Sequence, residues 1–592
     1  MQTVDFTTLT AVCAELRQGW LPARVEQAYQ RDRFTVALAL RTLTGRDWLT
    51  ISWHPQAARL CVDAPPPRDP DTFTFSQQLR HQLGGLALVA IEMAAWERVV
   101  DLQFARRPGE ATLWHLYVEI MGKYSNVILA TAEQQVITAA HQVGAQQSSV
   151  RTIQTGQPYQ PPPALRDPQP RLDEPLALWQ ERVSLVPGKL WKMLLQNYRG
   201  LSPSLTRQMV RAVGLDPNQS TDTLKPEDWG RLFERWREWL EILDTSAFRP
   251  ARLETGYTVM PWASASPAPS TQSLVAEYYQ QELNQQIFAQ LRHQLQQKLT
   301  SLLKKLAVKA EDFRQRLQQS DRAEQYRQRA DMLMAYLHEW QPGMSQIQLA
   351  DFETGEPIAI ALDPTKNAVQ NAQSFYKRHQ KMKRSRGAIE PLLLEVEAEM
   401  AYLEQVEVAI TQLEVYQSAD DLASLQEIQQ ELQQQGYLDG EQRQTRAAKT
   451  EFYRYQAPSG FDILVGRNNR QNDELTFKVA TEYDLWFHTQ EIPGSHLLLR
   501  LDPGAVAQEA DLQTAADLAA YHSRARQSDQ APVVYTDLKH VYKPKGAKPG
   551  MVIYKEETVI WGRPQAGKAI AETQASSAQQ AIATQQRGSA PR

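Results

Sequence analysis

The sequence predicts a multidomain protein of the α+β class. The chain has 592 residues, which is more than a single hydrophobic core supports. Short apolar runs of alternating polarity occur near both ends and predict antiparallel strands beside a few helices. The middle carries narrow apolar stripes with a spacing of three and four residues, typical of long helices that pack on one partner. We therefore expect a mixed domain at each end, an all-helical unit after the first, and a long antiparallel coiled-coil arm.

Residues 1–165 are predicted to form the first mixed domain, with a Pro/Gln-rich end. Its first helix covers residues 6–17, and a second covers 75–83, where Gly84-Gly85 ends it. Residues 145–173 are rich in Gln, Ser and Pro and are expected to be a linker or a long surface loop. The predicted strands are residues 24–28, 34–40, 48–53, 59–62, 86–94, 99–104, 113–120 and 126–131.

Residues 180–248 are predicted to be all helical. A short helix over 189–198, a turn that contains Gly200 and a second helix over 205–213 precede a longer amphipathic helix. This is the layout of a helix-hairpin-helix unit, in which turn amides and a helix N-terminus can face a phosphate. A purely structural three-helix cap fits the same spacing equally well.

Residues 270–425 are predicted to be the arm. One apolar stripe runs from Leu283 to Leu306 and another from Ile389 to Leu413, each among Gln, Glu, Lys and Arg. Neither stripe is wide enough for a globular core, so each is expected to bury the other. A continuous first helix over residues 273–340 would extend roughly 100 Å.

The predicted tip of the arm, residues 341–364, reads as a β-hairpin because alternating Ile and Leu residues flank Thr354-Gly355. A run of cations follows it, beginning at Lys366, and no acid lies between Asp363 and Glu390. A solvated helix face is the ordinary explanation of a charge run. Here the whole chain has a net charge of −4, so these cations are segregated and suit a polyphosphate surface. The predicted ribosome- or RNA-binding residues are Lys377, Arg378, Lys381, Lys383, Arg384 and Arg386.

Residues 450–564 are predicted to form the second mixed domain. An alanine-rich helix covers residues 511–525. From Gln565 to Arg592 the chain is almost free of large apolar residues, which predicts a disordered tail. The predicted strands of the domain are residues 461–465, 475–480, 485–489, 495–501, 533–535, 551–554 and 558–561.

Templates for catalysis, metals and cofactors fit poorly, so we expect a protein that is not an enzyme and carries no cofactor. There is no phosphate-binding loop, no glycine-rich dinucleotide turn and no metal-spaced Cys/His set. Cys13 and Cys61 are too few for a disulfide framework, and His488 with His496 fits core or surface structure better than a metal site. The sequence shows no export signal and no apolar span of membrane length, so a cytoplasmic protein without a membrane partner is expected.

Two polar loops of the second mixed domain are candidates for RNA contact. Residues 467–472 combine two arginines with four amide side chains, a donor set that suits RNA backbone and base edges. Residues 539–548 hold four lysines near three tyrosines that could stack on bases. The alternative is a pair of polar loops without a ligand.

Several motifs resemble the RqcH/NEMF family. Residues 465–473, 486–489, 492–496 and 543–550 resemble its C-terminal NFACT-R domain, residues 119–129 its NFACT-N signature and residues 198–203 its helix-hairpin-helix segment. Members of that family bind the large ribosomal subunit that remains, with peptidyl-tRNA, after a stalled ribosome splits. They bring in tRNA, so that the nascent chain receives a C-terminal tail that is mostly alanine in bacteria. The resemblance therefore implies the large subunit, peptidyl-tRNA and alanine tRNA as partners.

The resemblance also assigns residues. The family uses an acidic residue in the first helix, which Asp5 matches, and an Asp-Arg pair for tailing. Arg98 matches this pair, whereas Glu97 keeps the charge of the family's Asp but sets it one methylene further out. The predicted tRNA-binding residues are Asp5, Glu97, Arg98, Arg467, Asn468, Asn469, Arg470, His488 and Lys545.

Two other functions remain open at this level. Family members have been labelled fibronectin-binding, which would make the protein a surface adhesin. A generic RNA-binding protein without tailing activity would use the same cationic surfaces.

Overall fold

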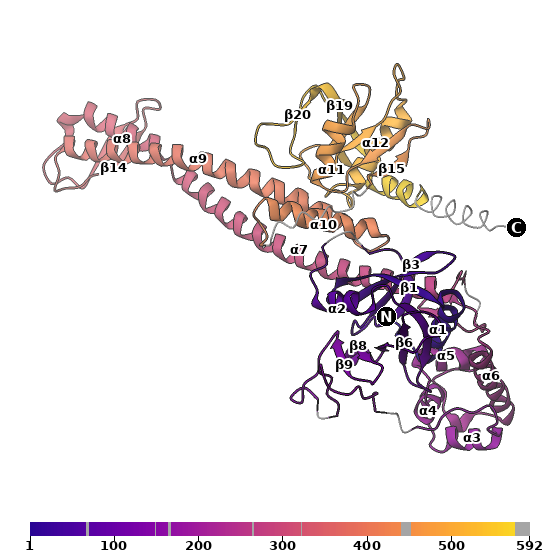
Figure 1. The fold of residues 1–592 in the computed structure, drawn as a ribbon. Helices are drawn as coiled ribbons and strands as arrows, with labels where there is room; N and C mark the ends of the chain where they lie inside the picture. Colours follow the sequence, from indigo (N-terminus) through magenta and orange to yellow (C-terminus); the bar gives the residue numbers. More distant parts are fainter. Residues whose placement is uncertain are drawn as a thin grey trace. The chain divides into compact units, whose positions relative to one another are not determined.

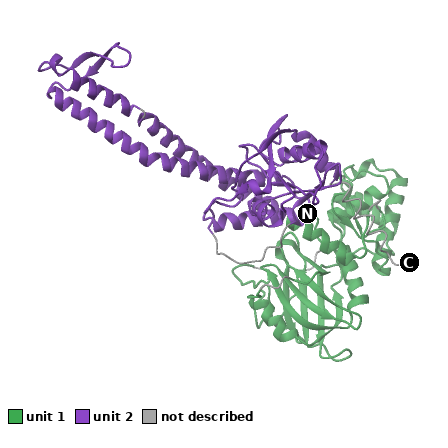
Figure 2. Ribbon diagram, turned by 90° about the horizontal axis from the view of Figure 1, so that it is seen from above, with its two compact units in different colours: residues 1–284 green, residues 285–592 purple. Residues whose placement is uncertain are grey.

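The computed structural model describes residues 1–66, 70–148, 150–163, 167–262, 266–320, 322–439 and 451–574. The chain divides into two compact units, residues 1–284 and 285–592 (Figure 2). Both units contain helices and strands, and long helices form an arm (Figure 1). The predicted α+β multidomain fold with a helical arm is confirmed. No helix in these described ranges is long and apolar enough to cross a membrane.

The first unit is built on one antiparallel sheet of nine strands, in the order β4-β3-β2-β1-β5-β6-β7-β8-β9. The helices α1 (Phe6–Trp20) and α2 (Thr74–Leu83) bury their apolar faces in the same core as the sheet, and Leu9, Leu79 and Leu102 are fully buried there. The strands are β1 (Ala23–Asp32), β2 (Thr35–Arg41), β3 (Arg46–Ser52), β4 (Arg59–Asp63), β5 (Ala87–Met93), β6 (Val99–Ala105), β7 (Trp114–Glu119), β8 (Asn126–Thr131) and β9 (Val136–Ala139).

The Gln/Ser/Pro-rich segment that follows β9 turns back on itself and contacts the sheet through residues 156–159. Val143 pairs with Ile153 in an isolated bridge, and the Tyr159 ring stacks on Tyr117 of β7 with 3.8 Å between the ring centroids. The sequence could not show this, because the aromatic partner lies about forty residues away and composition carries no information on distant contacts.

The helical part of the first unit consists of four helices around a tryptophan-rich core. Trp179, Trp236 and Trp239 are fully buried in it. A small sheet of β10 (Ala251–Arg252), β11 (Tyr257–Thr258) and β12 (Ser266–Pro267) follows. The helices are α3 (Leu176–Ser184), α4 (Leu190–Asn197), α5 (Pro203–Ala212) and α6 (Pro226–Thr245).

The arm belongs to the second unit from residue 285 onward. The predicted single helix over 273–340 is wrong: α7 (Thr271–Ser320) ends at Ser320, and a separate helix, α8 (Ala323–Ala335), follows. The Ser320 hydroxyl donates to the Leu317 carbonyl, a local bond that competes with continued helix. The helix α7 is therefore about 75 Å long at ~1.5 Å per residue, and not 100 Å.

The returning helix, α9 (Ala368–Gln412), packs on α7 as predicted, but the base of the arm has a third helix (Figure 1). Leu295 and Leu299 of α7 share a buried cluster with Leu403 and Ile410 of α9 and with Leu425 of α10 (Ala419–Gln434). The two stripes thus bury each other only with the help of α10. Within α9, Pro391 lies four residues after Gly387.

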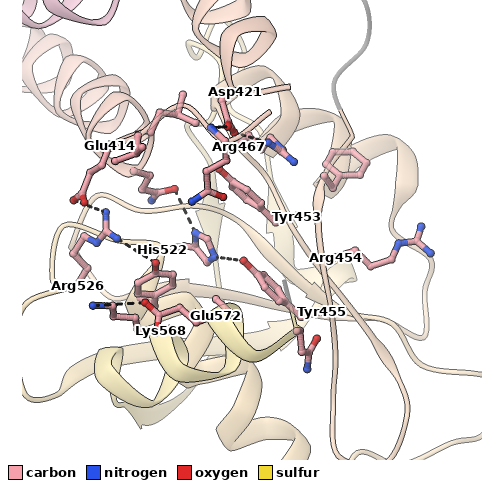
Figure 3. A pocket seen from close by; sticks show the side chains of 18 of the residues that line it. Glu414, Asp421, Tyr453, Arg454, Tyr455, Arg467, His522, Arg526, Lys568 and Glu572 are labelled. Atoms are coloured by element: carbon pink, nitrogen blue, oxygen red, sulfur yellow. Dashed lines mark hydrogen bonds and ion pairs between the residues drawn. The ribbon is translucent and has the colours of Figure 1, made fainter. Parts of the chain in front are cut away.

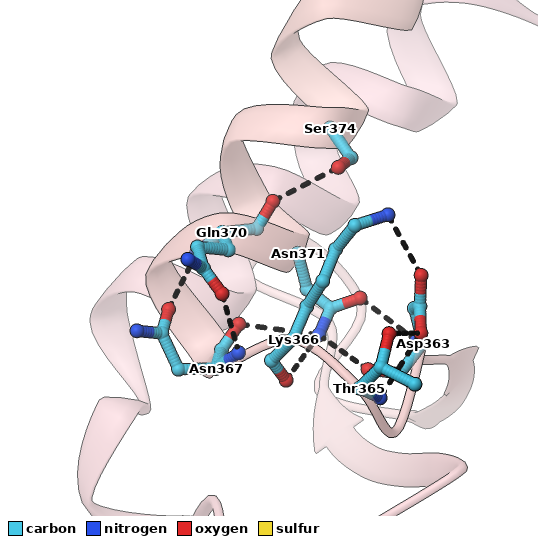
Figure 4. Close-up of polar contacts among 7 residues, drawn as sticks. All are labelled: Asp363, Thr365, Lys366, Asn367, Gln370, Asn371 and Ser374. Atoms are coloured by element: carbon cyan, nitrogen blue, oxygen red, sulfur yellow. Dashed lines mark hydrogen bonds and ion pairs between the residues drawn. The ribbon is translucent and has the colours of Figure 1, made fainter.

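The predicted hairpin at the tip is present as β13 (Gln346–Ala350) and β14 (Pro357–Ala361), which pair antiparallel. Ile347, Leu349 and Ile360 pack with the end of α8 and the start of α9. Figure 4 shows how α9 begins: Asn367 accepts a hydrogen bond from the Gln370 amide, which caps the helix.

The C-terminal domain is a six-stranded sheet in the order β15-β16-β18-β17-β19-β22, packed on α12 (Glu509–Tyr521). The predicted strand over 475–480 is wrong: α11 (Asn469–Glu474) continues into a turn of π-helix, Leu475–Val479. A short apolar run fits either structure, which explains the error. The other elements are β15 (Tyr453–Gln456), β16 (Asp462–Val465), β17 (Leu485–Thr489), β18 (Leu497–Leu499), β19 (Ala531–Asp537), β22 (Thr558–Gly562) and the separate ribbon β20 (Val541–Tyr542) with β21 (Ile553–Tyr554).

The start of the predicted disordered tail is helical. Residues 564–574 form a helix, and Gln574 exchanges hydrogen bonds with the backbone of Gln456 in β15. Ile570 and Ala571 also pack against the core of the domain, so these few apolar residues and the bonds to the edge strand together hold the helix in place. The remaining residues of the predicted tail, 575–592, lie outside the described part of the chain.

Candidate nucleic-acid interface

The Glu97-Arg98 pair lies in the turn between β5 and β6, and both side chains are half-buried. Trp96, just before the pair, adopts a positive φ of 57° and stacks on Phe6 at 5.0 Å. One guanidinium nitrogen of Arg98 donates to the Val4 carbonyl at 3.3 Å. The turn is thus tied to the start of α1, and Arg98 keeps further donors for a ligand.

The turn of the helix-hairpin-helix segment packs directly on this site. Gly200 has φ +75°, and a Cβ there would lie 2.6 Å from the Trp96 ring. The Ser202 side chain accepts from the Leu205 amide and so caps α5. The N-terminus of α5 is therefore used inside the protein, and the structural reading of this segment fits the geometry better than the phosphate-binding one.

Asp5 is the residue that connects these parts. Its side chain is only 6% exposed and caps α1 by accepting from the Thr8 amide at 2.8 Å. Its other carboxylate oxygen accepts from the Ser202 hydroxyl at 2.6 Å. Asp5 was predicted to bind tRNA; in this geometry it can act on a ligand only by holding α1, α5 and the Arg98 turn together.

Two neighbours of Arg98 escaped selection from the sequence. The Arg98 carbonyl accepts from the Ile120 amide, which brings the turn between β7 and β8 next to the Glu97-Arg98 turn. On that neighbouring turn Tyr124 is 71% exposed, and the Lys123 ammonium lies 4.9 Å from its ring centroid. An exposed aromatic ring beside a cation is a stacking surface for an unpaired base. Lys123 and Tyr124 are distant from Arg98 in the sequence, so their proximity to it could not be predicted.

Glu119 fixes the segment after β9 beside the same turns. It is buried, and burial raises the pKa of its carboxyl group. The carboxylate accepts from Arg151 at 2.5 Å and from the Tyr159 hydroxyl at 2.9 Å. These contacts position the loop that ends at Tyr159 and leave Glu119 unable to meet a ligand directly.

On the arm, all six predicted cations of α9 are exposed. Lys377, Lys381 and Arg384 are spaced by four and three residues, so they form one stripe, opposite the buried Phe375 and Ile389. This stripe is a cationic face that points away from the rest of the arm. The other three residues, Arg378, Lys383 and Arg386, lie on other faces of the helix.

Lys366 does not belong to that surface, although the run of cations began with it. It forms an ion pair of 2.7 Å with Asp363, three residues earlier (Figure 4). The hydrogen bonds from Lys366 and Thr365 lower the pKa of the Asp363 carboxyl to about 2. The acid at the edge of the run compensates the first cation, which a count of charges could not show.

The donor loop of residues 467–470 is not an open surface in this structure. Each of its four side chains contacts α10 of the same chain. Arg467 pairs with Asp421 at 3.4 Å, Asn468 donates to Glu427 at 2.7 Å, Asn469 donates to Glu431 at 3.2 Å, and Arg470 donates to Gln434. The predicted loop is in part helical, since α11 begins at Asn469, and the helix α10 that precedes the domain supplies acceptors for its donors. Contact of these donors with RNA stays a prediction.

His488 and His496 are both buried in the C-terminal domain. Burial lowers the pKa of His488 to about 4 and that of His496 to about 3, so both are neutral near pH 7. His488 shares a hydrogen bond with the Gly494 carbonyl, and His496 with Thr476. The described residues contain no group of three or more ligands that could hold a metal. Because the His488 side chain is buried, it cannot make the predicted contact with tRNA in this arrangement.

Lys545 lies on the exposed turn between β20 and β21. Its neighbours are engaged: Lys543 pairs with Asp473, and the Lys548 ammonium lies 4.7 Å from the Tyr402 ring centroid and contacts Tyr437. Of these three lysines, Lys545 has the side chain most available to a phosphate.

A cleft of about 720 Å³ lies between the base of the arm and the C-terminal domain (Figure 3). Its polar lining is already connected: Arg526 pairs with Glu414 at 3.2 Å, and His522 bonds Tyr455 at 3.0 Å. Burial lowers the pKa of His522 to about 3, so it is neutral. The cleft is therefore a polar joint between the base of the arm and the C-terminal domain.

The chain matches two protein-family models. Residues 5–451 match "NFACT N-terminal and middle domains", and residues 451–556 match "NFACT protein RNA binding domain". The second match covers the donor loop and most of the C-terminal sheet.

Curated relatives match along nearly the whole chain. "Rqc2 homolog RqcH" of Streptococcus suis is 31% identical over 561 residues, which cover 92% of this chain and 95% of the relative. The protein of the same name from Bacillus subtilis is 29% identical over 570 residues, with 94% and 97% covered. A solved structure, the C-terminal part of a fibronectin/fibrinogen-binding protein from Streptococcus suis, is 32% identical, covers 48% of this chain and 98% of that chain, and has a TM-score of 0.37.

Proposed function

The chain belongs to the NFACT family, and from that membership we propose that it serves ribosome-associated quality control by binding the large ribosomal subunit that carries peptidyl-tRNA. On this proposal it recruits tRNA, taken to be alanine tRNA, for C-terminal tailing of the nascent chain. The observation that carries the proposal is the uninterrupted match of residues 5–556 to the two family models, together with 31% identity to a relative named RqcH.

The two units offer separate contacts for such a task. In the first unit, Arg98, Lys123 and Tyr124 combine a guanidinium, an ammonium and an exposed ring on adjoining turns. Arginine can bond a phosphate or a guanine edge through two donors, and a tyrosine can stack on an unpaired base. We assign this surface to tRNA.

In the second unit, the stripe of Lys377, Lys381 and Arg384 presents three cations on one face of α9. A helix of this kind binds nucleic acid through phosphates and does not read sequence. We assign it to ribosomal RNA of the large subunit. The protein then acts as a positioning factor and breaks no bond, since the ribosome itself performs peptide transfer.

Affinity purification tests the proposal. The tagged protein is purified from cells treated with an antibiotic that stalls translation, and the bound ribosomal particles and tRNA are identified by sedimentation and RNA sequencing. We expect free large subunits and one enriched tRNA. Recovery of neither species, or of intact ribosomes with a random set of tRNAs, would contradict the assignment.

A further inference from the structure

The C-terminal domain meets the base of the arm through charges of opposite sign. Arg524 pairs with Glu404 and Glu407, each at 3.2 Å, and Arg526 pairs with Glu414 at 3.2 Å. The three acids lie on the last turns of α9 and just after it. We call the domain residues Arg467, Asn468, Asn469, Arg470, Arg524 and Arg526 the domain face, and the arm residues Glu404, Glu407, Glu414, Asp420, Asp421, Glu427 and Glu431 the arm face.

The acids of α10 continue this pattern. Asp421, Glu427 and Glu431 follow each other along α10 at rises of roughly 6–9 Å, and each accepts from a different residue of the donor loop. In every ion pair that the described residues form across this joint, the acid lies on the arm and the cation on the domain. A row of carboxylates that meets arginine and asparagine donors is the arrangement that RNA phosphates make with a protein.

The joint has little apolar contact to make it permanent. Among the described residues of the C-terminal domain, Met551 is the member that packs against the buried cluster of the arm. The polar cleft of Figure 3 occupies part of the joint. The pairs of Arg524 with Glu404 and Glu407 have side chains that are 31–41% exposed, and exposed ion pairs are weak and screened by salt. Asn468, Asn469 and Glu431 are buried at the joint. The exposed ion pairs of the joint therefore suit repeated opening.

We propose that the domain face is an RNA-binding surface and that the arm face occupies it as an intramolecular competitor, so that RNA binding is coupled to release of the domain from the arm. This inference rests on the proposed function, because it takes the C-terminal domain to bind RNA. It specifies where that RNA binds and what regulates access. It also explains why donors suited to RNA are covered in the free protein.

The competitor can be weakened without touching the RNA-binding side. In the arm variant, Glu404→Gln, Glu407→Gln, Glu414→Gln and Asp420→Asn remove four carboxylates whose side chains are 31–58% exposed, so folding is spared. In the domain variant, Arg524→Gln and Arg526→Gln break the ion pairs with Glu404, Glu407 and Glu414 from the other side and leave that of Asp420 with Arg467 in place. The probe is a fluorescein-labelled 20-nucleotide oligouridylate, titrated by anisotropy at several salt concentrations.

A competitor and a passive joint give opposite results. We expect the arm variant to bind the oligonucleotide about 5- to 20-fold tighter at 0.1 M salt, with a steeper fall of affinity as salt rises. The domain variant should bind more weakly than the unmodified protein, although it also loses the ion pairs with Glu404, Glu407 and Glu414. Equal effects of both variants, or no effect of either, would overturn the inference.

A distance measurement tests the coupling itself. Cys13 and Cys61 are both buried, so Thr411→Cys and Ser528→Cys, which are exposed on the two sides of the joint, can carry a donor and an acceptor dye. Energy transfer should fall when the oligonucleotide binds. Unchanged transfer at saturation would overturn the coupling. If these tests fail while the protein still captures large subunits and tRNA, only this inference falls; if it captures neither, the proposed function falls.

Discussion

The Ser202 hydroxyl donates a 2.6 Å hydrogen bond to the buried carboxylate of Asp5. Each residue also caps a helix, Asp5 at the start of α1 and Ser202 at the start of α5. One bond therefore couples the helix that precedes the sheet to the turn that supports Trp96. This hydrogen bond therefore helps to fix the position of the Glu97-Arg98 turn.

Asp5→Ala should destabilise the first unit by about 2–3 kcal/mol, since it removes a helix cap and leaves the Ser202 hydroxyl without its acceptor. Urea unfolding followed by tryptophan fluorescence measures the loss. Asp5→Asn keeps an acceptor for the Thr8 amide and should cost less. If the unmodified protein and both variants unfolded with the same free energy, the buried hydrogen bonds of Asp5 would not contribute to stability.

Arg98→Ala should weaken tRNA binding about 10- to 100-fold, because a charge-assisted hydrogen bond contributes roughly 1.5–3 kcal/mol. Capture of large subunits should persist. Arg107→Ala, an exposed arginine of the same domain, is the matched control. Filter binding with total tRNA provides the measurement, and normal affinity in the Arg98 variant would remove this residue from the site.

Replacing Lys377, Lys381 and Arg384 by Gln should weaken binding of the large subunit and reduce the slope of log affinity against log salt by about 2–3. The reason is that up to three phosphate contacts, with their released counterions, are lost. The control is Arg316→Gln with Arg327→Gln, since both arginines lie on the arm but already pair with acids of their own helix. If sedimentation binding changed equally in the two variants, the stripe would be no more than a solvated face.

Glu431 should make the contact between the arm and the C-terminal domain sensitive to pH. Burial is the largest cause of the shift and raises the pKa of Glu431 to about 7. The hydrogen bonds from Tyr402 and Asn469 and the charge of Arg470 lower this pKa, whereas the charge of Asp473 raises it. The folded state thus binds the proton more tightly than the unfolded state does. The contribution of Glu431 to the free energy of unfolding is complete below about pH 4.5 and is lost as pH rises to about 7, a decrease of about 3 kcal/mol.

Glu431→Gln removes the ionisable group but keeps an acceptor for both partners. We expect this variant to lose the decline between pH 4.5 and 7 and to be more stable than the unmodified protein at pH 8. Urea unfolding of the second unit at pH 5, 7 and 8 tests this. Parallel pH profiles of the two proteins would contradict the role of Glu431.

Much of the fold could be predicted because periodicity reports which face of an element is buried. The stripes of α7 and α9 and the alternation in β13 and β14 are examples, and both elements appear where expected. The break after Ser320 was missed because the polar pattern of the arm continues across it. The turn Leu475–Val479 was missed because a short apolar run does not distinguish a strand from a helix.

The candidate site was harder to predict, because residue types reveal donors but not the partners that occupy them. Arg467 and Asn468 are well suited to phosphates, yet in the folded chain they meet Asp421 and Glu427. The reverse holds for Tyr124, whose proximity to Arg98 depends on the pairing of β6 with β7. Contacts between distant segments decide both cases.

The spacing of Gly387 and Pro391 in α9 has a mechanical consequence. Proline has no amide hydrogen, so the carbonyl of Gly387, four residues earlier, does not receive the usual helical hydrogen bond. The helix is consequently more compliant at this level than along the rest of its length. The cationic stripe lies between this compliant level and the tip of the arm. Thermal bending of α9 can therefore change the direction in which the stripe points while the base of the arm remains stiff.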